Sequence, residues 1–154
     1  LNDWDVSSVT TMAYMFNYAR DFNQPLNAWD VSRVTIMGAM FERADVFNQP
    51  LNDWDVSSVT DMSSMFRCDD STCAFNQTLN AWNVSSVTIM EFMFNGAAVF
   101  NQTLNAWDVS SVTTMAHMFY GAEEHEQHVP IRLRIQPAAF NQTLNAWDVS
   151  RVTT

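Results

Sequence analysis

The chain of 154 residues contains no lysine, because its seven basic residues are all arginine, and with 17 acidic residues its formal net charge is −10. This balance disfavours a nucleic-acid interface and a polybasic membrane anchor. No window approaches the run of about 20 apolar residues that a membrane span requires. The first residues show neither an initiating Met nor a signal pattern, so we expect a fragment of a longer array.

Glycine, histidine and cysteine are also scarce, with three, three and two copies. The sequence offers no Gly-rich phosphate loop, no serine nucleophile elbow and no spaced Cys/His metal set. We therefore expect a protein that is not an enzyme and holds no cofactor. Hydrophobic residues make up 47% of the chain, which is too much for a disordered acidic tail and enough for one domain with a core.

The abundant residues form a repeat. All six Trp lie in L-N-x-W-[DN]-V-S, and all ten Met lie in M-x-x-M-F segments. The leading Leu of each unit, at positions 1, 26, 51, 79, 104 and 144, gives steps of 25, 25, 28, 25 and 40 residues by subtraction. A fixed period of this size indicates a repeat architecture. We predict one domain over 1–154, with about six 25-residue repeats and insertions at 68–73 and 123–137.

The hydrophobic spacing changes within each unit. The segment 47–54 alternates, and the slot before its Leu holds Pro or Thr in different units, which favours a short strand. Val59, Met62 and Met65 then follow at intervals of three, which places them on one face of a short helix. The sequence thus predicts an α/β repeat solenoid of short parallel strands and short helices, stacked so that neighbours share a core.

The units FNQPLNDWDVSSVTDMSSMF and FNQTLNAWDVSSVTTMAHMF resemble the BspA-type leucine-rich repeat of the DUF285 family. The resemblance covers the chain apart from the two insertions. It implies a right-handed, leucine-rich-repeat-like solenoid. Family members are mostly surface or secreted proteins of bacteria, with relatives in protists and algae, and their proposed roles are adhesion and protein binding. The resemblance brings no catalytic residues.

Two polar residues recur at fixed slots and are expected to be structural. The Asn of F-N-Q is expected to bond backbone groups of the neighbouring unit. The Asp of W-D-V-S is expected to make a local turn, because the one exception is an Asn, which keeps the acceptor oxygen; binding of Ca²⁺ by the stacked carboxylates is the less favoured alternative. These slots hold Asn23, Asn48, Asn76, Asn101 and Asn141, and Asp5, Asp30, Asp55, Asn83, Asp108 and Asp148.

Four Asn-x-Ser/Thr glycosylation sequons occur, at Asn76, Asn83, Asn101 and Asn141. Three are the FNQT form of the repeat, so their default explanation is the Asn slot itself. A side chain that faces inward would exclude a glycan.

Cys68 and Cys73 occur only in an inserted loop, which favours a local disulfide and an oxidising compartment, extracellular or at a cell surface. A metal site would need two further ligands. In the long insertion, His125 and His128 lie among acidic residues, but their spacing is one residue short of the helical zinc signature. A solvated acidic loop is the favoured interpretation, followed by an alternating strand that packs back on the repeats or contacts a partner.

Specific binding needs side chains that differ between units. Variation is concentrated in the slot after the first Met of each unit, in the stretches 17–21 and 42–46, and in the 123–137 insertion. We therefore predict a protein-interaction or scaffold role there, docked on a cell surface or in a larger assembly. The alternative is a binder of glycan or ice through repeated Ser/Thr ranks. The candidate partner-binding residues are Tyr14, Phe92, His117, Glu123, His125, His128, Ile131, Arg132, Leu133 and Arg134.

Overall fold

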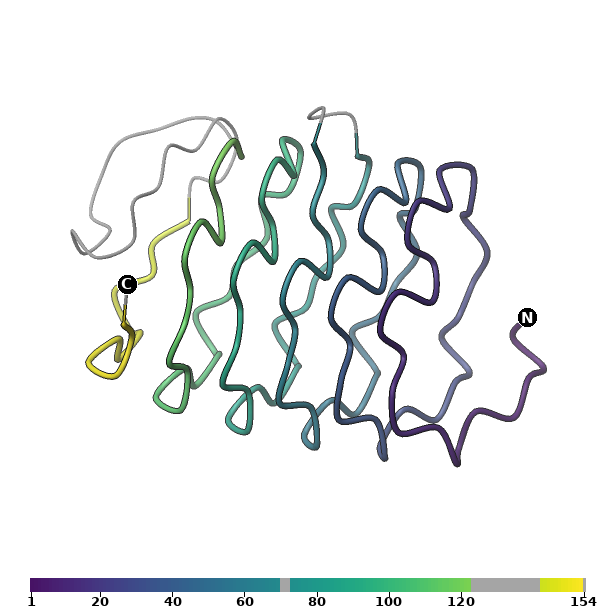
Figure 1. The fold of residues 1–154 in the computed structure, drawn as a ribbon, viewed down its shortest axis with the longest axis horizontal. Helices are drawn as coiled ribbons and strands as arrows, with labels where there is room; N and C mark the ends of the chain where they lie inside the picture. Colours follow the sequence, from purple (N-terminus) through teal and green to yellow (C-terminus); the bar gives the residue numbers. More distant parts are fainter. Residues whose placement is uncertain (70–72, 123–141, 154) are drawn as a thin grey trace.

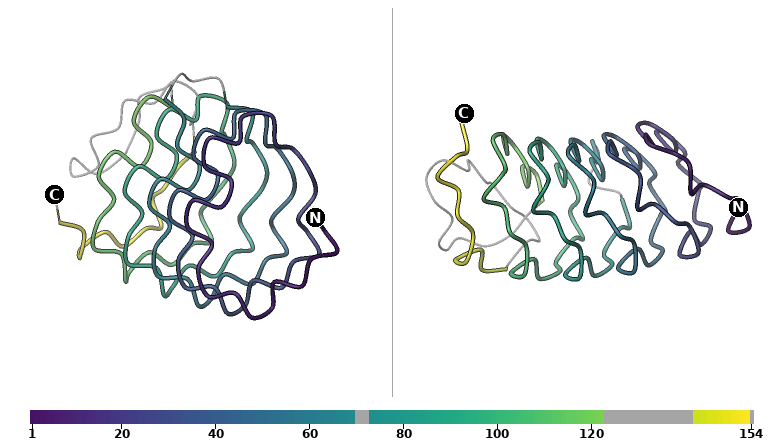
Figure 2. Two further views of the ribbon diagram at one scale, coloured as in Figure 1. Left: turned by 45° about the vertical axis from the view of Figure 1, so that its right-hand side comes forward. Right: turned by 90° about the horizontal axis from the view of Figure 1, so that it is seen from below.

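In the computed structural model, which describes residues 1–69, 73–122 and 142–153, the chain winds through successive turns stacked side by side. The turns follow one another in sequence order along the longest axis, and the two termini lie at opposite ends (Figure 1). The same order is visible from below in Figure 2. Each repeat therefore contacts mainly the repeats before and after it.

The prediction of an α/β repeat solenoid with short strands and short helices is wrong. The described residues contain no helix, and their only β pairing is a series of isolated parallel bridges. They consequently contain no helix that could span a bilayer. The bridges lie in the segment expected to be helical, and they join Thr11 to Ile36, Ile36 to Asp61, Asp61 to Ile89, Ile89 to Thr114, and Thr114 to Thr153.

Hydrogen bonding to the next turn explains why no helix forms after Thr60. The N–H groups of Met62, Ser64 and Phe66 donate to carbonyls of the following turn at 2.8–3.0 Å. An α-helix would instead direct each N–H to the carbonyl four residues earlier in the same segment. Ser64 also has a positive φ of 55°, in the left-handed region. A backbone in which a left-handed residue stands among residues of negative φ cannot propagate a helix, although the Met side chains still point to one side.

The expected strand at 47–54 is absent because side chains take the place of the backbone ladder. The N–H of Asn48 donates to Oδ1 of Asn23 at 3.0 Å, and Nε2 of Gln49 donates to the carbonyl and Oδ1 of Asn23. Asn76 in turn donates its N–H to Oδ1 of Asn48. Asn23 and Asn48 thus serve as acceptors for the following turn, and Asn76 and Asn101 do the same, so the segment needs no β bridge there.

The core consists of stacked aromatic rings and buried Met, Leu and Val. Phe66 shows the arrangement: its ring lies 5.7 Å from that of Phe41 in the preceding turn and 5.6 Å from that of Phe94 in the following one. It also packs on Phe75 at 4.0 Å. Five units supply a ring at the Phe66 slot, namely Phe16, Phe41, Phe66, Phe94 and Phe119, so the aromatic stack continues from turn to turn.

Tryptophan also links the turns, through hydrogen bonds from its indole N–H. The indole Nε1 of Trp54 donates to the carbonyl of Leu26 at 3.1 Å, and Trp82 donates likewise to Leu51 at 2.8 Å. Both side chains are buried. A buried indole N–H needs a partner, and the Leu carbonyl one unit earlier provides it.

Candidate functional site

One side of the stack carries three adjacent ranks whose side chains change from turn to turn; we call it the variable face. The backbone fixes its register, because the N–H of Tyr14 donates to the carbonyl of Gly38, and that of Arg43 donates to the carbonyl of Arg67. Equivalent bonds recur in later turns. The ranks are Tyr14, Ala39, Ser64, Phe92 and His117; Asn17, Glu42, Arg67, Asn95 and Tyr120; and Tyr18, Arg43, Cys68, Gly96 and Gly121.

The middle of the variable face is held by ion pairs. Arg43 is buried and its Nη1 lies 2.6 Å from Oδ2 of Asp69. Arg67 binds Oδ1 of the same carboxylate at 3.0 Å and Oε1 of Glu42 at 3.2 Å. Pairs that share partners and are partly shielded from water hold one geometry better than isolated surface pairs do. This network therefore gives the face a fixed centre.

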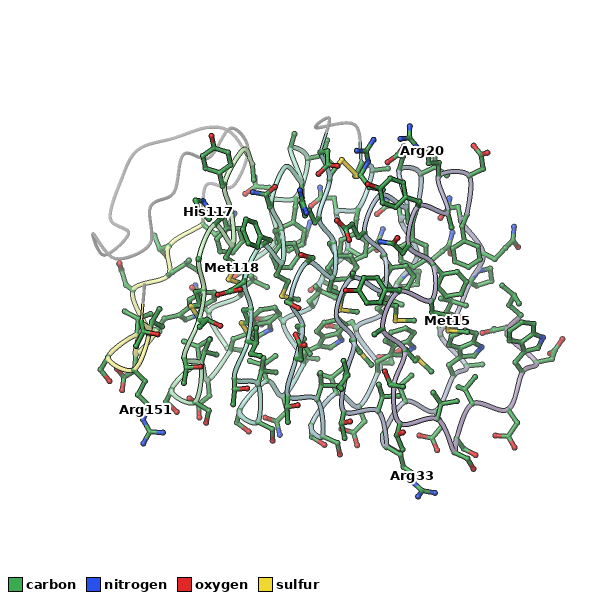
Figure 3. All side chains as sticks on the ribbon, in the orientation of Figure 1. Met15, Arg20, Arg33, His117, Met118 and Arg151 are labelled. Carbon is green, nitrogen blue, oxygen red and sulfur yellow. A yellow bond between two sulfur atoms is a disulfide. The ribbon has the colours of Figure 1, made fainter. Side chains whose placement is uncertain are left out.

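Aromatic side chains flank that centre on both sides. The Arg43 guanidinium lies over the Tyr18 ring at 5.5 Å, and Arg67 lies over Phe92 at 5.7 Å. The Phe92 ring stacks with His117 at 5.1 Å. Much of this aromatic surface is open to solvent: Tyr14 is 66% exposed and Tyr18 54%. Figure 3 shows Arg20 and His117 in the upper part of the molecule, away from the edge that bears Arg33 and Arg151.

Three of the partner-binding residues expected from sequence lie on the variable face: Tyr14, Phe92 and His117. All three have positive φ, of 61°, 57° and 56°. Tyr14 and His117 are exposed and Phe92 is half-buried. The other seven, Glu123, His125, His128, Ile131, Arg132, Leu133 and Arg134, lie outside the described residues.

Tyr18 and Arg43 lie in the stretches 17–21 and 42–46, which the sequence already marks as variable, whereas Arg67 and Tyr120 were not singled out. The signal was present, because these residues follow the variable slot by three or four positions, and those positions also change from unit to unit. The expected helix did not indicate that these slots share one face. A segment with alternating backbone conformation brings the three slots into adjacent ranks on one face.

The opposite edge, which we call the Asp edge, repeats one local turn. Oδ1 of Asp30 accepts the N–H of Ser32 at 3.1 Å and its hydroxyl at 2.7 Å. Asn83 makes the same two bonds to Ser85, at 3.2 and 2.8 Å. The acceptor oxygen therefore builds the turn whether or not it carries charge. Asp5, Asp55, Asp108 and Asp148 likewise accept the N–H of the Ser two residues on.

These bonds hold the pKa of each turn carboxyl below its ordinary value. The Ser hydroxyl and the Ser N–H both favour the ionised form of the carboxyl, and they do so at Asp5, Asp30, Asp55, Asp108 and Asp148. A carboxyl with a depressed folded-state pKa adds stability above its unfolded pKa and loses that contribution as pH falls through the folded one. We expect the free energy of unfolding to fall as pH drops through about 4, measured by urea denaturation from pH 6 to 3.

A matched variant separates these five carboxyls from the remaining acids. Changing all five Asp to Asn keeps the acceptor oxygen, as Asn83 demonstrates, and removes the titrating groups. We expect its stability at pH 6 to stay near that of the unchanged chain and its loss between pH 5 and 3 to be smaller. Equal pH dependence of the two proteins would contradict the assignment.

Cys68 and Cys73 are joined by a disulfide, with their Cα atoms 5.9 Å apart, and both side chains are buried. Asp45 lies beside them, with Oδ1 3.7 Å from Sγ of Cys73. These three residues could supply ligand atoms within 4.8 Å of one another. In the disulfide, however, neither sulfur is a thiolate, which is the form that binds metal. The cluster therefore works here as a cross-link beside the ion pairs of the variable face.

Removing this disulfide has a predictable cost. Closing a loop of about six residues restricts the unfolded chain by about 2 kcal/mol, so we expect Cys68→Ala with Cys73→Ala to lower the melting temperature by roughly 4–8 °C. Calorimetry with and without reductant measures the change. Reductant should lower the melting temperature of the unsubstituted chain only. An equal effect on the double variant would show that the disulfide is not the source of the stability difference.

Comparison with known families gives two matches, to residues 1–73 and 67–131, and both are to the sequence profile of DUF285, described as a Mycoplasma protein of unknown function. The two matches together span most of the chain. The family description does not extend to a leucine-rich-repeat class. Comparison with curated proteins and with solved structures gave no match.

Proposed function

We propose that this chain, which belongs to the DUF285 family, is a non-enzymatic interaction module or scaffold that binds a protein partner through its variable face. The observation that supports this best is the contrast between two sides of the stack. The Asp edge repeats one residue type in five of its six units, whereas no residue type recurs in the rank of Tyr14, Ala39, Ser64, Phe92 and His117. A partner can distinguish the turns only where they differ.

The chemistry of the variable face suits a protein partner. Tyr, Phe and Arg are the residue types most often found at the energetic centres of protein interfaces. Here Tyr14 and Tyr18 lie at one end, Phe92, His117 and Tyr120 lie at the other, and the ion pairs of Arg43 and Arg67 lie between them. The fixed backbone register lowers the entropy lost on binding, because the side chains start from a defined arrangement.

The alternative, a glycan or ice binder with repeated hydroxyls, has weaker support. The Thr rank is regular, but Oγ1 of Thr35 donates to the carbonyl of Thr10 at 3.1 Å, and Oγ1 of Thr60 donates to Thr35 at 3.2 Å. The same bond recurs at Thr88, Thr113 and Thr153. Because the hydroxyl proton of each of these five Thr residues is already donated inside the stack, this rank offers only acceptor lone pairs to a ligand. An ice-recrystallisation assay tests this alternative directly.

The proposed location is a cell surface or another oxidising compartment. The disulfide between Cys68 and Cys73 supports it, because structural disulfides persist in such environments.

A site-specific cross-linking experiment tests the proposed interface. A photoreactive amino acid replaces Tyr18 on the variable face or, as the matched control, Ser58 on the Asp edge, and the chain is exposed to a surface extract of its source cells. We expect Tyr18 to yield a defined cross-linked protein and Ser58 to yield none. Competition by excess unlabelled chain establishes that the product is specific.

Two variants complete the test. Tyr14→Ser with Tyr18→Ser and Tyr120→Ser should abolish the cross-link at a fourth position of the face, Asn95, while preserving the melting temperature, because all three side chains are more than half exposed. Replacing 123–137 by the shorter connection of the other units tests the insertion. Undiminished capture by the triple Tyr variant would rule out the variable face.

A further inference from the structure

Asn83 differs from the residue that every other unit carries at its slot. The remaining five units read W-D-V-S, and only this one reads W-N-V-S. The change keeps the turn, since Oδ1 of Asn83 still accepts both the N–H and the hydroxyl of Ser85. It also creates an N-glycosylation sequon at the centre of the Asp edge.

We propose that Asn83 is an N-glycosylation site, modified by a membrane-bound oligosaccharyltransferase that carries its sugar on a lipid pyrophosphate. In the reaction Nδ2 of Asn83 bonds to the anomeric carbon of the sugar, and the bond from that carbon to the pyrophosphate oxygen breaks. Nδ2 gives one proton to a basic group of the transferase, and the lipid pyrophosphate leaves with the bonding electron pair. The net exchange involves no oxidant or reductant.

The local geometry prepares Asn83 for this reaction. The hydroxyl of Ser85 donates to Oδ1 at 2.8 Å, which stabilises negative charge on that oxygen and makes the Nδ2 protons more acidic. Among the described residues, Nδ2 of Asn83 donates to no other group, and the side chain is exposed. The reacting nitrogen is thus presented to solvent while the rest of the amide is held in place.

The turn needs only residues 83–85. It can therefore form on a chain that has not yet folded, which is the form of a protein during translocation. It also remains open after folding, because the neighbouring slots hold the exposed side chains of Asp55 and Asp108, and the adjacent Val84 points into the core. A glycan at Asn83 would cover no buried group and would leave the variable face accessible.

The two FNQT sequons that lie within the described residues, at Asn76 and Asn101, do not show this geometry. Asn76 is half-buried, and its Oδ1 accepts the N–H of Asn101 at 2.9 Å and Nε2 of Gln102 at 3.0 Å rather than the hydroxyl of Thr78. Oδ1 of Asn101 accepts Nε2 of Gln142 at 3.0 Å. These oxygens serve the stack between turns, so their sequons follow from the Asn ladder. Asn141 lies outside the described residues.

The test translates residues 1–154 behind a cleavable signal peptide in the presence of endoplasmic-reticulum microsomes, and examines only the protease-protected chain. We expect a mass increase that peptide-N-glycosidase removes, with Asn83 converted to Asp and labelled by ¹⁸O from water. Translocated chain with an unmodified Asn83 would overturn the proposal. Modification of Asn83 that persists in Ser85→Ala would overturn the role of the Ser hydroxyl.

The repeat supplies the matched controls. Asn83→Asp restores the residue of the other units, so it should abolish the modification and leave the melting temperature of the unmodified protein unchanged. Asp108→Asn creates N-V-S in the next unit with the same turn, and we expect it to add a second glycan. If Asp108→Asn gains nothing while Asn83 is modified, the turn geometry is not what selects the site, and that part of the proposal is wrong.

Discussion

Gly96→Ala is expected to destabilise the protein by at least about 3 kcal/mol. A Cβ atom at Gly96 would lie 1.6 Å from the carbonyl oxygen of Cys68 and 2.8 Å from its carbonyl carbon. Both are backbone atoms, and Cys68 is tied to this region by its N–H bond to the carbonyl of Asn95. The overlap can be relieved only by separating two turns, which would also disturb the buried disulfide.

The backbone conformation adds to this cost, since Gly96 has a φ of 69°, where a residue with a Cβ pays roughly 1–2 kcal/mol. Gly121 provides the matched control: its φ is 75°, but an added Cβ would meet Gly96 Cα at an ordinary 3.5 Å. Gly121→Ala should therefore show only the conformational penalty. Urea denaturation of both variants measures the difference, and equal losses of unfolding free energy would show that the close approach to Cys68 is unimportant.

Trp107→Ala is the second large expected effect, at about 3–5 kcal/mol. Trp107 is 2% exposed and stacks between Trp82 at 6.4 Å and Trp147 at 6.2 Å. Its indole Nε1 donates to the carbonyl of Leu79 at 3.0 Å. The truncation thus opens a cavity in a continuous stack and removes a bond between turns. Thermal unfolding should shift downward by roughly 10 °C.

Trp4 offers the same residue type at the same slot with fewer contacts. It is 56% exposed and, within the part of the chain that the structure describes, stacks only on Trp29, at 6.5 Å. Trp4→Ala should cost about 1–2 kcal/mol. Trp107→Phe separates the contribution of ring stacking from that of the indole hydrogen bond, because it retains a ring and removes the N–H donor. We expect this variant to lose about 1–2 kcal/mol of unfolding free energy. If Trp4→Ala costs as much as Trp107→Ala, stacking between turns is not the source of the stability.

Part of the candidate site could be predicted from sequence because its signal is variation at a fixed slot. Tyr14, Phe92 and His117 were found in this way, and the structure places them on one face. The stretch 42–46, which contains Arg43, was marked as variable in the same way, but its ion pairs were not predicted, since Arg43 and Arg67 meet Asp69 and Glu42 only when consecutive turns are in register. Interactions between turns have no signature inside one unit.

The sequence by itself determined the repeat, the buried residues and the local turns. These depend on composition and on short-range contacts. A Leu, Trp or Met that recurs from unit to unit is buried where a turn has neighbours on both sides, and the bond from the N–H of Ser32 to Oδ1 of Asp30 spans two residues. Tertiary structure alone decided the backbone between Thr60 and Phe66. Met residues spaced by three are compatible with a helix, but the N–H groups of Met62, Ser64 and Phe66 donate to carbonyls of the next turn instead. The left-handed conformation of Ser64 directs these N–H groups toward that turn.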